Sequence, residues 1–420
     1  MSAQPPATPA PGPLGAAERI ALIDVLRGFA LFGILVVNMA SFKSAALASQ
    51  VAATLPDQAA TWLISFGFQT KFYVLFSFLF GYGLSVQMVR AAVRGTSLVP
   101  PFLRRLLGLL LLGFAHAALL YTGDILVTYA ILGTILLLLR NAADATLLRT
   151  AATLITATVL MLAVGGIALA IIGPAADAVD QASETARIVA AFRGTPTNII
   201  GQRLREYPGI LAFALFGQGP TALAMFLIGL WAGRRRLLER VEDNLPLLRR
   251  ARSLGLVVGS AGGVAWATYR VVNGFDFSGP FLLASAVNFA TAPFLTAAFA
   301  ATLTLLYRAP RWRRWLAPLA PVGRMALSNY LLQSLVGAFV FTGYGLGLFG
   351  RVGAAAGLVL SVAIYAAQLP LSAWWLRRFA FGPAEWLLRS FTYARLQPLR
   401  SRRASIGGAA STQAPPPVSD

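Results

Sequence analysis

The chain has 420 residues, of which 57% are apolar and only 12% are charged, and its net charge is +20. Uncharged runs long enough to cross the roughly 30 Å hydrocarbon core of a bilayer recur along its whole length. These features predict an all-α, polytopic transmembrane helical bundle. The chain has no cysteine and a single histidine, which excludes disulfides, thiolate metal sites and multi-histidine metal centres.

The positive charge lies in short clusters between apolar runs, which argues against a nucleic-acid partner and for membrane topology. Hydropathy and length predict about ten spans, at residues 20–42, 72–89, 106–123, 125–139, 150–172, 209–233, 253–273, 280–307, 323–349 and 352–376. Arginines gather in alternate loops, after spans two, four, six, eight and ten. By the positive-inside rule these loops and both termini are cytoplasmic.

The regions between and beyond the spans differ in composition. Residues 1–18 and 396–420 are predicted to be disordered cytoplasmic tails, because they have too few apolar residues to bury. They flank an N-terminal transmembrane region, 19–172, and a C-terminal one, 209–395. The segment 173–208 is predicted to be an extracytoplasmic loop, in which Val179 to Phe192 has helix-like apolar spacing. This loop is either a lid over a pocket or a solvated connector.

Span one carries polar groups near both ends. Asp24 and Arg27, three residues apart, share one helix face near the inner end, where they form either a structural ion pair or a phosphate contact. Asn38 lies near the outer end. Lys71, at the outer end of span two, is either an interface anchor that extends to the membrane surface or part of a polar site.

The only histidine, His116, lies in an uncharged run, and Asp124 follows eight residues later. An ionisable group in the hydrocarbon layer costs a few kcal/mol or more, which makes it a functional candidate. His116 near the end of span three and Asp124 at the start of span four are expected at similar depth, together with Asn38. The structural alternatives are an interhelical hydrogen bond for His116 and an N-cap for Asp124.

Span nine places Ser328, Asn329, Tyr330 and Gln333 in an otherwise apolar helix. Such amide and hydroxyl groups either hold helices together or line a polar tunnel.

These segments resemble the YeiB-like family of bacterial inner-membrane proteins, catalogued as domain of unknown function 418. The resemblance covers roughly residues 19–395. It rests on Ile23-Asp24-Val25-Leu26-Arg27-Gly28, Val37-Asn38, Lys71-Phe72, Leu79-Phe80-Gly81, Leu112 to His116, Gly123 to Leu126 with Tyr129 and Gly133, Gly323 to Tyr330 with Gln333, and Gly382 to Leu387 with Arg389.

The resemblance implies a bacterial inner-membrane, multi-pass protein. The family's fold looks distantly similar to the transmembrane acyltransferases, such as heparan-alpha-glucosaminide N-acetyltransferase, which carry an acyl group from cytoplasmic acyl-CoA across the membrane with a histidine as base. In those relatives the histidine belongs to span one or follows it directly. This chain has Asn38 there, so His116 would act from another helix.

The leading hypothesis is therefore an acyltransferase with His116 as general base, Asp124 orienting it and Asn38 donating to the oxyanion. Arg27, Arg104, Arg105 and Arg324 would bind the phosphates of acyl-CoA, a co-substrate and not a tightly bound cofactor. Lys71, Tyr129, Asn329, Tyr330 and Gln333 would contact an envelope glycan or small-molecule acceptor. The alternative is a transporter of a small solute or lipid precursor. The sequence does not identify the acyl donor, the acceptor or the oligomeric state.

Overall fold

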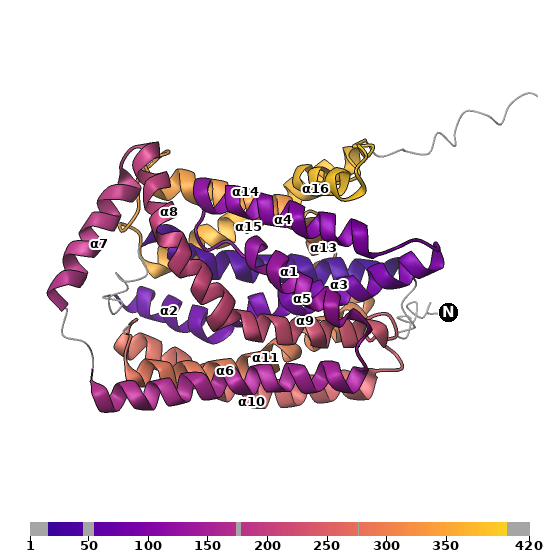
Figure 1. Ribbon diagram of the computed structural model, residues 1–420, viewed down its shortest axis with the longest axis horizontal. Helices are drawn as coiled ribbons and strands as arrows, with labels where there is room; N and C mark the ends of the chain where they lie inside the picture. The colour runs from indigo at the N-terminus through magenta and orange to yellow at the C-terminus, as the bar shows by residue number, and fades with distance from the viewer. Residues whose placement is uncertain (1–15, 45–53, 174–177, 276, 401–420) are drawn as a thin grey trace, which may run out of the picture.

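The computed structural model describes residues 16–44, 54–173, 178–275 and 277–400. Within these ranges the regular secondary structure is helical (Figure 1), apart from one antiparallel bridge between Phe379 and Arg400. Seven helical segments are long and apolar enough to cross a membrane: Ala21–Lys43, Leu55–Val93, Val99–Leu119, Asp144–Ile172, Pro196–Arg234, Gly279–Tyr307 and Ala354–Arg378. The prediction of an all-α membrane protein is confirmed.

The sequence predicted about ten spans, and each predicted segment overlaps a helix. Length and apolarity alone, however, select seven. Helices α5 (Leu126–Leu138) and α14 (Ala326–Phe341) are apolar but short, because 13 and 16 residues reach only about 20 and 24 Å at ~1.5 Å per residue. Helix α10 (Leu245–Asn273) has 29 residues but is not among the seven.

The helices pack in three groups that Figure 1 shows one above another. The lowest contains α6 (Asp144–Ile172), α10 and α11 (Gly279–Tyr307), and α6 and α11 also pack on the central group. The central group contains α1 (Ala16–Lys43), α3 (Lys71–Val93), α5 and α9 (Gly219–Arg234), whose apolar side chains, including Leu26, Leu75 and Phe226, form much of the buried core. The upper group contains α4 (Val99–Leu119), α14 and α15 (Ala354–Arg378).

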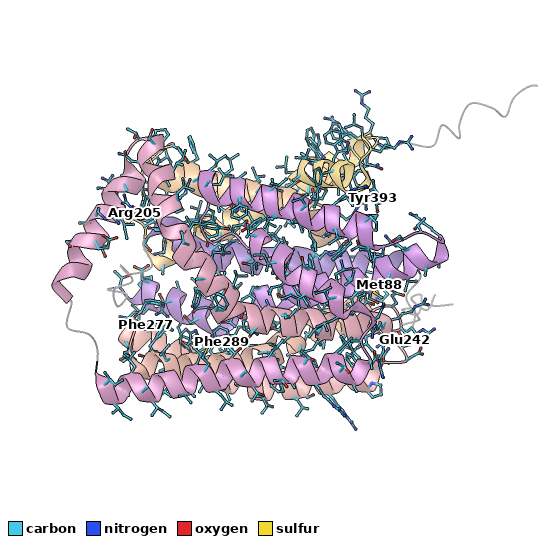
Figure 2. All side chains as sticks on the ribbon, viewed as in Figure 1. Met88, Arg205, Glu242, Phe277, Phe289 and Tyr393 are labelled. Carbon is cyan, nitrogen blue, oxygen red and sulfur yellow. The ribbon has the colours of Figure 1, made fainter. Side chains whose placement is uncertain are left out.

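Shorter helices complete the chain: α2 (Leu55–Gly67), α7 (Ala178–Arg193), α8 (Pro196–Ala212), α12 (Pro310–Leu316), α13 (Leu319–Arg324) and α16 (Pro383–Tyr393), with the single turn η2 (Leu139–Asn141) and the π-helical segment η3 (Phe213–Gln218). Glu242 and Met88 mark the arginine-rich end of the bundle, and Arg205 and Phe277 mark the opposite end (Figure 2). These two ends are called the inner and the outer end below.

The segment predicted as an outer loop, 173–208, is mostly helical where the structure describes it, with a short break at Gly194 and Thr195. Val179 to Phe192 lies within α7, and residues 196–208 belong to α8, which continues through η3 into α9. Of the predicted tails, residues 1–15 and 401–420 lie outside the described residues. Residues 396–400 return to the bundle, because Ala380 donates its N–H to the Leu399 carbonyl.

Two glycines bring α13 against α1. A Cβ at Gly323 would collide with the Asp24 carbonyl, and a Cβ at Gly28 would collide with the Leu319 carbonyl. Small residues allow such close backbone approach between helices in a membrane. The contact places Arg27 on α1 beside Arg324 at the end of α13, where both border the same cavity.

Candidate functional site

His116 and Asp124 form a buried pair at the outer end of the α4–α5 hairpin. His116 Nδ1 lies 2.7 Å from Asp124 Oδ2, and both residues are at most 4% exposed. Asp124 Oδ1 also accepts the N–H of Val127, at 2.9 Å, in the first turn of α5. Asp124 therefore both caps α5 and holds the imidazole. Because a carboxylate only accepts hydrogen bonds, the hydrogen of this contact lies on Nδ1, and Nε2 is the ring nitrogen without a partner among the described residues.

Gly113 makes room for this pair. A Cβ at this position of α4 would lie 2.7 Å from Asp124 Oδ1 and 2.8 Å from the Val127 nitrogen. Alanine would therefore push the carboxylate away from His116. The glycine of the Leu112-Gly113-Phe114-Ala115-His116 motif thus has a direct steric role.

Three tyrosines surround the pair. The rings of Tyr330 and Tyr121 lie 5.0 and 6.2 Å from the His116 ring. The Tyr207 hydroxyl, from α8, lies close enough to Asp124 to interact with it electrostatically. His116 Nε2 and the hydroxyls of Tyr207 and Tyr330 are buried without a hydrogen-bond partner among the described residues. Unsatisfied buried polar atoms are rare, so this cluster can accept and donate hydrogen bonds to a ligand.

Asn38 lies at the depth of this cluster. One turn below it on α1, Ile34 lines the inner cavity. One turn above it, Phe42 packs on Tyr121 with ring centroids 4.3 Å apart. Residues four apart share a helix face, so half-buried Asn38 lies on the face of α1 that turns toward the cavity and Tyr121. From these neighbours we expect Asn38 to face the same side of the bundle as His116 and Asp124.

Helix α8 closes the outer side. Arg203, 3% exposed, donates to the Leu119 carbonyl at the end of α4 and to the Tyr344 hydroxyl. Its guanidinium also lies over the rings of Phe192 and Tyr344. Arg203 therefore joins the end of α4, the end of α7 and the segment that follows α14 on the outer side of His116.

A cavity of about 900 Å³ opens on the inner side. Its deep part is lined by apolar residues from α1, α3, α4 and α5, together with Tyr129 and Tyr330. Tyr330 therefore lines the cavity and also packs on His116. The lining of the cavity includes three carboxylic acids and seven arginines: Arg27, Arg90, Arg94, Arg105, Arg236, Arg324 and Arg389. The excess of arginine makes the cavity electropositive, a charge that suits an anionic ligand.

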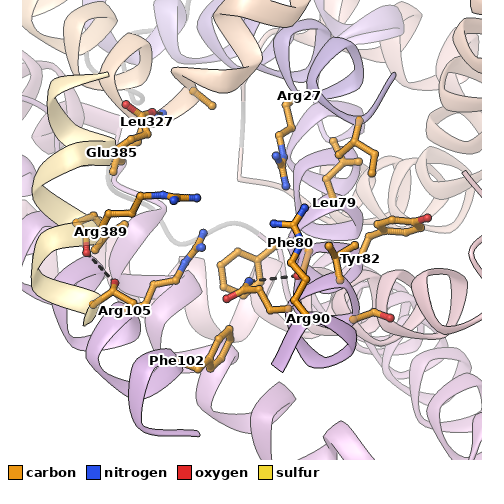
Figure 3. A pocket seen from close by; sticks show the side chains of 18 of the residues that line it. Arg27, Leu79, Phe80, Tyr82, Arg90, Phe102, Arg105, Leu327, Glu385 and Arg389 are labelled. Carbon is orange, nitrogen blue, oxygen red and sulfur yellow. Dashed lines mark hydrogen bonds between the residues drawn. The ribbon is translucent and has the colours of Figure 1, made fainter. Parts of the chain in front are cut away.

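Three of these arginines converge from different helices (Figure 3). Arg27, Arg105 and Arg389 reach into the same space from α1, α4 and α16. Arg27 pairs with Asp24, at 3.2 Å, whereas Arg105 Nε is buried with no partner in the described part of the chain. Arg105 is electrostatically coupled to Arg27 and Arg389. Like charges held this close are stabilised by an anion between them.

The other predicted site residues separate into two sets. Tyr129 lines the cavity, and its hydroxyl forms a 2.7 Å hydrogen bond with Ser77 Oγ. Asn329 and Gln333 instead hold α14 against α15, because Asn329 Nδ2 donates to Ser372 Oγ at 2.9 Å and Gln333 Nε2 to Gln368 Oε1 at 2.8 Å. Arg104 is exposed and does not line the cavity.

Lys71 is not a surface anchor. It is 1% exposed, and its Nζ donates to the Ser65 carbonyl at 3.1 Å and to Asn288 Oδ1 at 2.9 Å. It follows the break between α2 and α3, where Thr70 has a φ of 72°. Neither Lys71 nor Asn288 lines the inner cavity, so Lys71 is not part of the cavity wall.

The sequence interpretation missed Arg389, Glu385 and Tyr207 as site residues. The arginine pattern of the sequence places Arg389 in a cytoplasmic cluster, whereas in the structure it lies on α16, six residues after the first helical residue, Pro383. Nothing in the sequence indicates that α8 packs near the α4–α5 hairpin, so no sequence pattern could identify Tyr207 as a site residue.

Comparison with known proteins identifies relatives along most of the chain. Residues 232–395 match a family described as protein of unknown function (DUF418). YxaH of Bacillus subtilis (strain 168) is 36% identical over 403 residues, covering 92% of this chain and 97% of the relative. YeiB of Escherichia coli (strain K12) is 30% identical over 420 residues, covering 92% of this chain and 99% of the relative. Both relatives are described as uncharacterized, so they supply a family but no activity.

Proposed function

The chain belongs to the DUF418 family, with YeiB and YxaH, and we propose that it is a membrane acyltransferase that uses cytoplasmic acyl-CoA to acylate an extracytoplasmic acceptor. One observation carries the proposal: the arginine-lined cavity ends at Tyr330, whose ring packs 5.0 Å from that of His116. A phosphorylated donor in the cavity and a general base at His116 would thus meet at one residue.

The orientation follows from charge. The arginine-rich loops lie at the mouth of the cavity, so the positive-inside rule makes this mouth cytoplasmic. Ten crossings, in which α5, α10 and α14 count as spans, then place both termini in the cytoplasm and the His116 end outside. The bacterial inner membrane is where cytoplasmic acyl-CoA and an envelope glycan or small-molecule acceptor face opposite sides of one bilayer.

The donor fits the cavity in charge and in length. Arg105 and Arg389, with Arg27 and Arg324 nearby, suit the phosphate groups, because guanidinium groups bind phosphate in a bidentate manner. Arg105 and His116 are 11 residues apart on α4, which is roughly 16 Å at 1.5 Å per residue. An extended arm between the phosphates and the thioester would occupy the apolar part of the cavity.

The chemistry uses the free nitrogen of His116. Nε2 takes the proton of the acceptor hydroxyl or amine while the oxygen or nitrogen of the acceptor attacks the thioester carbonyl carbon. In this proposal Asn38 and the Tyr330 hydroxyl would donate to the developing oxyanion. The C–S bond then breaks, and the thiolate takes the proton from the imidazolium, which leaves an acylated acceptor and a free thiol. Asp124 stabilises the transient imidazolium.

The test follows radiolabelled acyl groups from acyl-CoA into the envelope fraction of cells that express the wild type or His116→Gln. The amide can replace one ring hydrogen bond, so the variant is expected to insert normally yet lose about 100-fold or more in transfer. Arg104→Gln, which changes an exposed residue, is the matched control. Full transfer by a correctly inserted His116→Gln protein would remove His116 from catalysis.

Transport of a small solute or lipid precursor is the second candidate. Its specific support is the pair of helix breaks, at residues 68–70 before Lys71 and at Met325 between α13 and α14, because broken helices surround the binding sites of many transporters. Wild-type protein that transfers no acyl group but moves a solute across proteoliposomes would favour this function.

A further inference from the structure

Helix α16 has two distinct faces. One packs against α4, where Leu388 and Phe391 close over Gly108, and it also lines the inner cavity through Glu385 and Arg389. The other face is apolar and uncovered. Leu387 is 56% and Phe391 42% exposed, and Tyr393 and Leu396, just beyond, are 51% and 77% exposed. Leu387 lies on this outward face, and Phe391, four residues later, lies at the border of the two faces, because its ring packs over Gly108 and is still partly exposed.

The surroundings of this face indicate what covers it. On α4, Leu103, Leu107 and Leu111 form an exposed apolar stripe at a spacing of four residues, as expected of a helix that faces lipid. Helix α16 packs on α4 at Gly108, beside this stripe. Its apolar face therefore continues the lipid-facing surface of the bundle at the inner end, where Figure 1 shows α16 beside α4.

The charges near α16 are those of a surface that meets anionic lipid. Arg377, Arg378, Arg389 and Arg395 are exposed around it. Glu385, the only acid of the helix, points inward to the first turn of α14. Basic residues beside a membrane helix attract anionic headgroups, each by roughly 1 kcal/mol near the surface.

We propose that α16 is an interfacial helix: its face with Leu387 and the exposed part of Phe391 lies at the acyl-chain boundary of the cytoplasmic leaflet, and the exposed arginines beside it, Arg377, Arg378 and Arg395, bind anionic lipid headgroups. An amphipathic helix with this distribution lies in the membrane plane with its apolar face about 5–10 Å deep. The inference stands apart from the proposed acyl transfer, because it rests on exposure and charge alone.

The consequence is a lipid-supported wall of the cavity. Glu385 joins α16 to the start of α14, and α14 carries Tyr330 at the deep end of the cavity. Arg389, on the same helix, points into the cavity (Figure 3). The leaflet that holds α16 thus also holds an anion-binding arginine in place.

The test uses the absence of cysteine from the chain. Single cysteines at Leu387 and Phe391 carry a nitroxide label in proteoliposomes that contain phosphatidylglycerol and phosphatidylcholine. Leu107→Cys on the lipid-facing stripe and Asp243→Cys in an exposed inner loop are the reference positions. The α16 labels are expected to be roughly tenfold more accessible to oxygen, relative to a water-soluble nickel complex, than the label at position 243. Accessibility equal to that at position 243 overturns the proposal.

Two further measurements complete the test. The α16 labels are expected to lie shallower in pure phosphatidylcholine, and equal depth in both lipids would overturn the headgroup contact. Hydroxyl-radical footprinting of the unmodified protein in nanodiscs covers the case in which labelled variants misfold. Leu387, Phe391 and Leu396 are expected to be protected from oxidation, and oxidation as fast as that of an exposed loop would overturn the membrane contact.

Discussion

Glu385 and Ser328 cap each other's helices. Glu385 Oε1 accepts the N–H groups of Leu327, at 2.7 Å, and Ser328, at 3.1 Å, in the first turn of α14. Ser328 Oγ donates to Glu385 Oε2 and accepts the N–H of Ala384, at 3.0 Å, in the first turn of α16. A Cβ at Gly382 would collide with Glu385 Oε2. The two C-terminal motifs therefore form one joint beside the cavity.

Because each residue satisfies backbone donors of the other's helix, their losses should not add. Ser328→Ala and Glu385→Ala are each expected to lower the free energy of unfolding by about 1–2 kcal/mol. The double variant should lose less than the sum, by at least about 0.5 kcal/mol. Denaturant unfolding in detergent micelles measures all three. Strict additivity would show that the two caps are independent.

Glu385 also predicts a pH dependence. Burial raises the pKa of this carboxyl above its ordinary value, although the hydrogen bonds from Ser328 and the α14 backbone act in the opposite direction. The folded state then binds the proton more tightly than the unfolded state, so this contribution to stability is full below about pH 4.3 and is lost as the pH rises through the raised pKa. Glu385→Gln should flatten this part of the melting temperature profile. An unchanged profile would contradict the prediction.

Arg104 and Arg105 are neighbours with opposite surroundings. Arg104 is exposed, whereas Arg105 lines the cavity and has a buried Nε without a partner in the described chain. Arg105→Gln is expected to weaken acyl-CoA binding by about tenfold or more, because it removes a charge-assisted contact. Arg104→Gln should change it less than about twofold. Calorimetric titration of the purified protein compares them, and equal losses would place the donor elsewhere.

The sequence predicted the buried His116 pair well, because an ionisable group in an apolar run is visible without a structure. Opposite helix directions then predicted Asp124 at matching depth, which the 2.7 Å contact with His116 confirms, whereas the convergence of Asn38 stays a prediction. It could not separate Tyr330, which lines the cavity, from Asn329 and Gln333, which bind α15. That division depends on helix rotation. Nor could the hydrophobic periodicity distinguish Arg105 from Arg104, because which of the two neighbours faces the cavity depends on the rotation of α4.

The orientation of the bundle can be tested with the same cysteine-free chain. Thr122→Cys, in the α4–α5 turn, and Thr197→Cys, exposed at the start of α8, are expected to react with an impermeant maleimide added to intact spheroplasts. Asp243→Cys at the inner end should react only after the membrane is opened, because the arginine-rich loops are cytoplasmic. The reverse pattern would invert the topology and detach the cavity from cytoplasmic acyl-CoA.

Asp124 performs two tasks that different substitutions separate. Asparagine can keep its oxygen on the Val127 N–H, but its amide then presents a donor to His116 Nδ1. That contact favours the ring tautomer with hydrogen on Nε2. In this tautomer Nε2 has no lone pair with which to take a proton from the substrate that receives the acyl group. Asp124→Asn is therefore expected to lower acyl transfer by about 100-fold or more while it keeps the melting temperature near that of the wild type.

Asp124→Ala should lose transfer equally and also lower the free energy of unfolding by about 1 kcal/mol, because the N-terminal turn of α5 loses its cap. Measuring transfer and thermal unfolding on both variants distinguishes the two roles. Wild-type transfer by Asp124→Asn would reduce Asp124 to a helix cap and leave the orientation of His116 to Tyr330 and Tyr121.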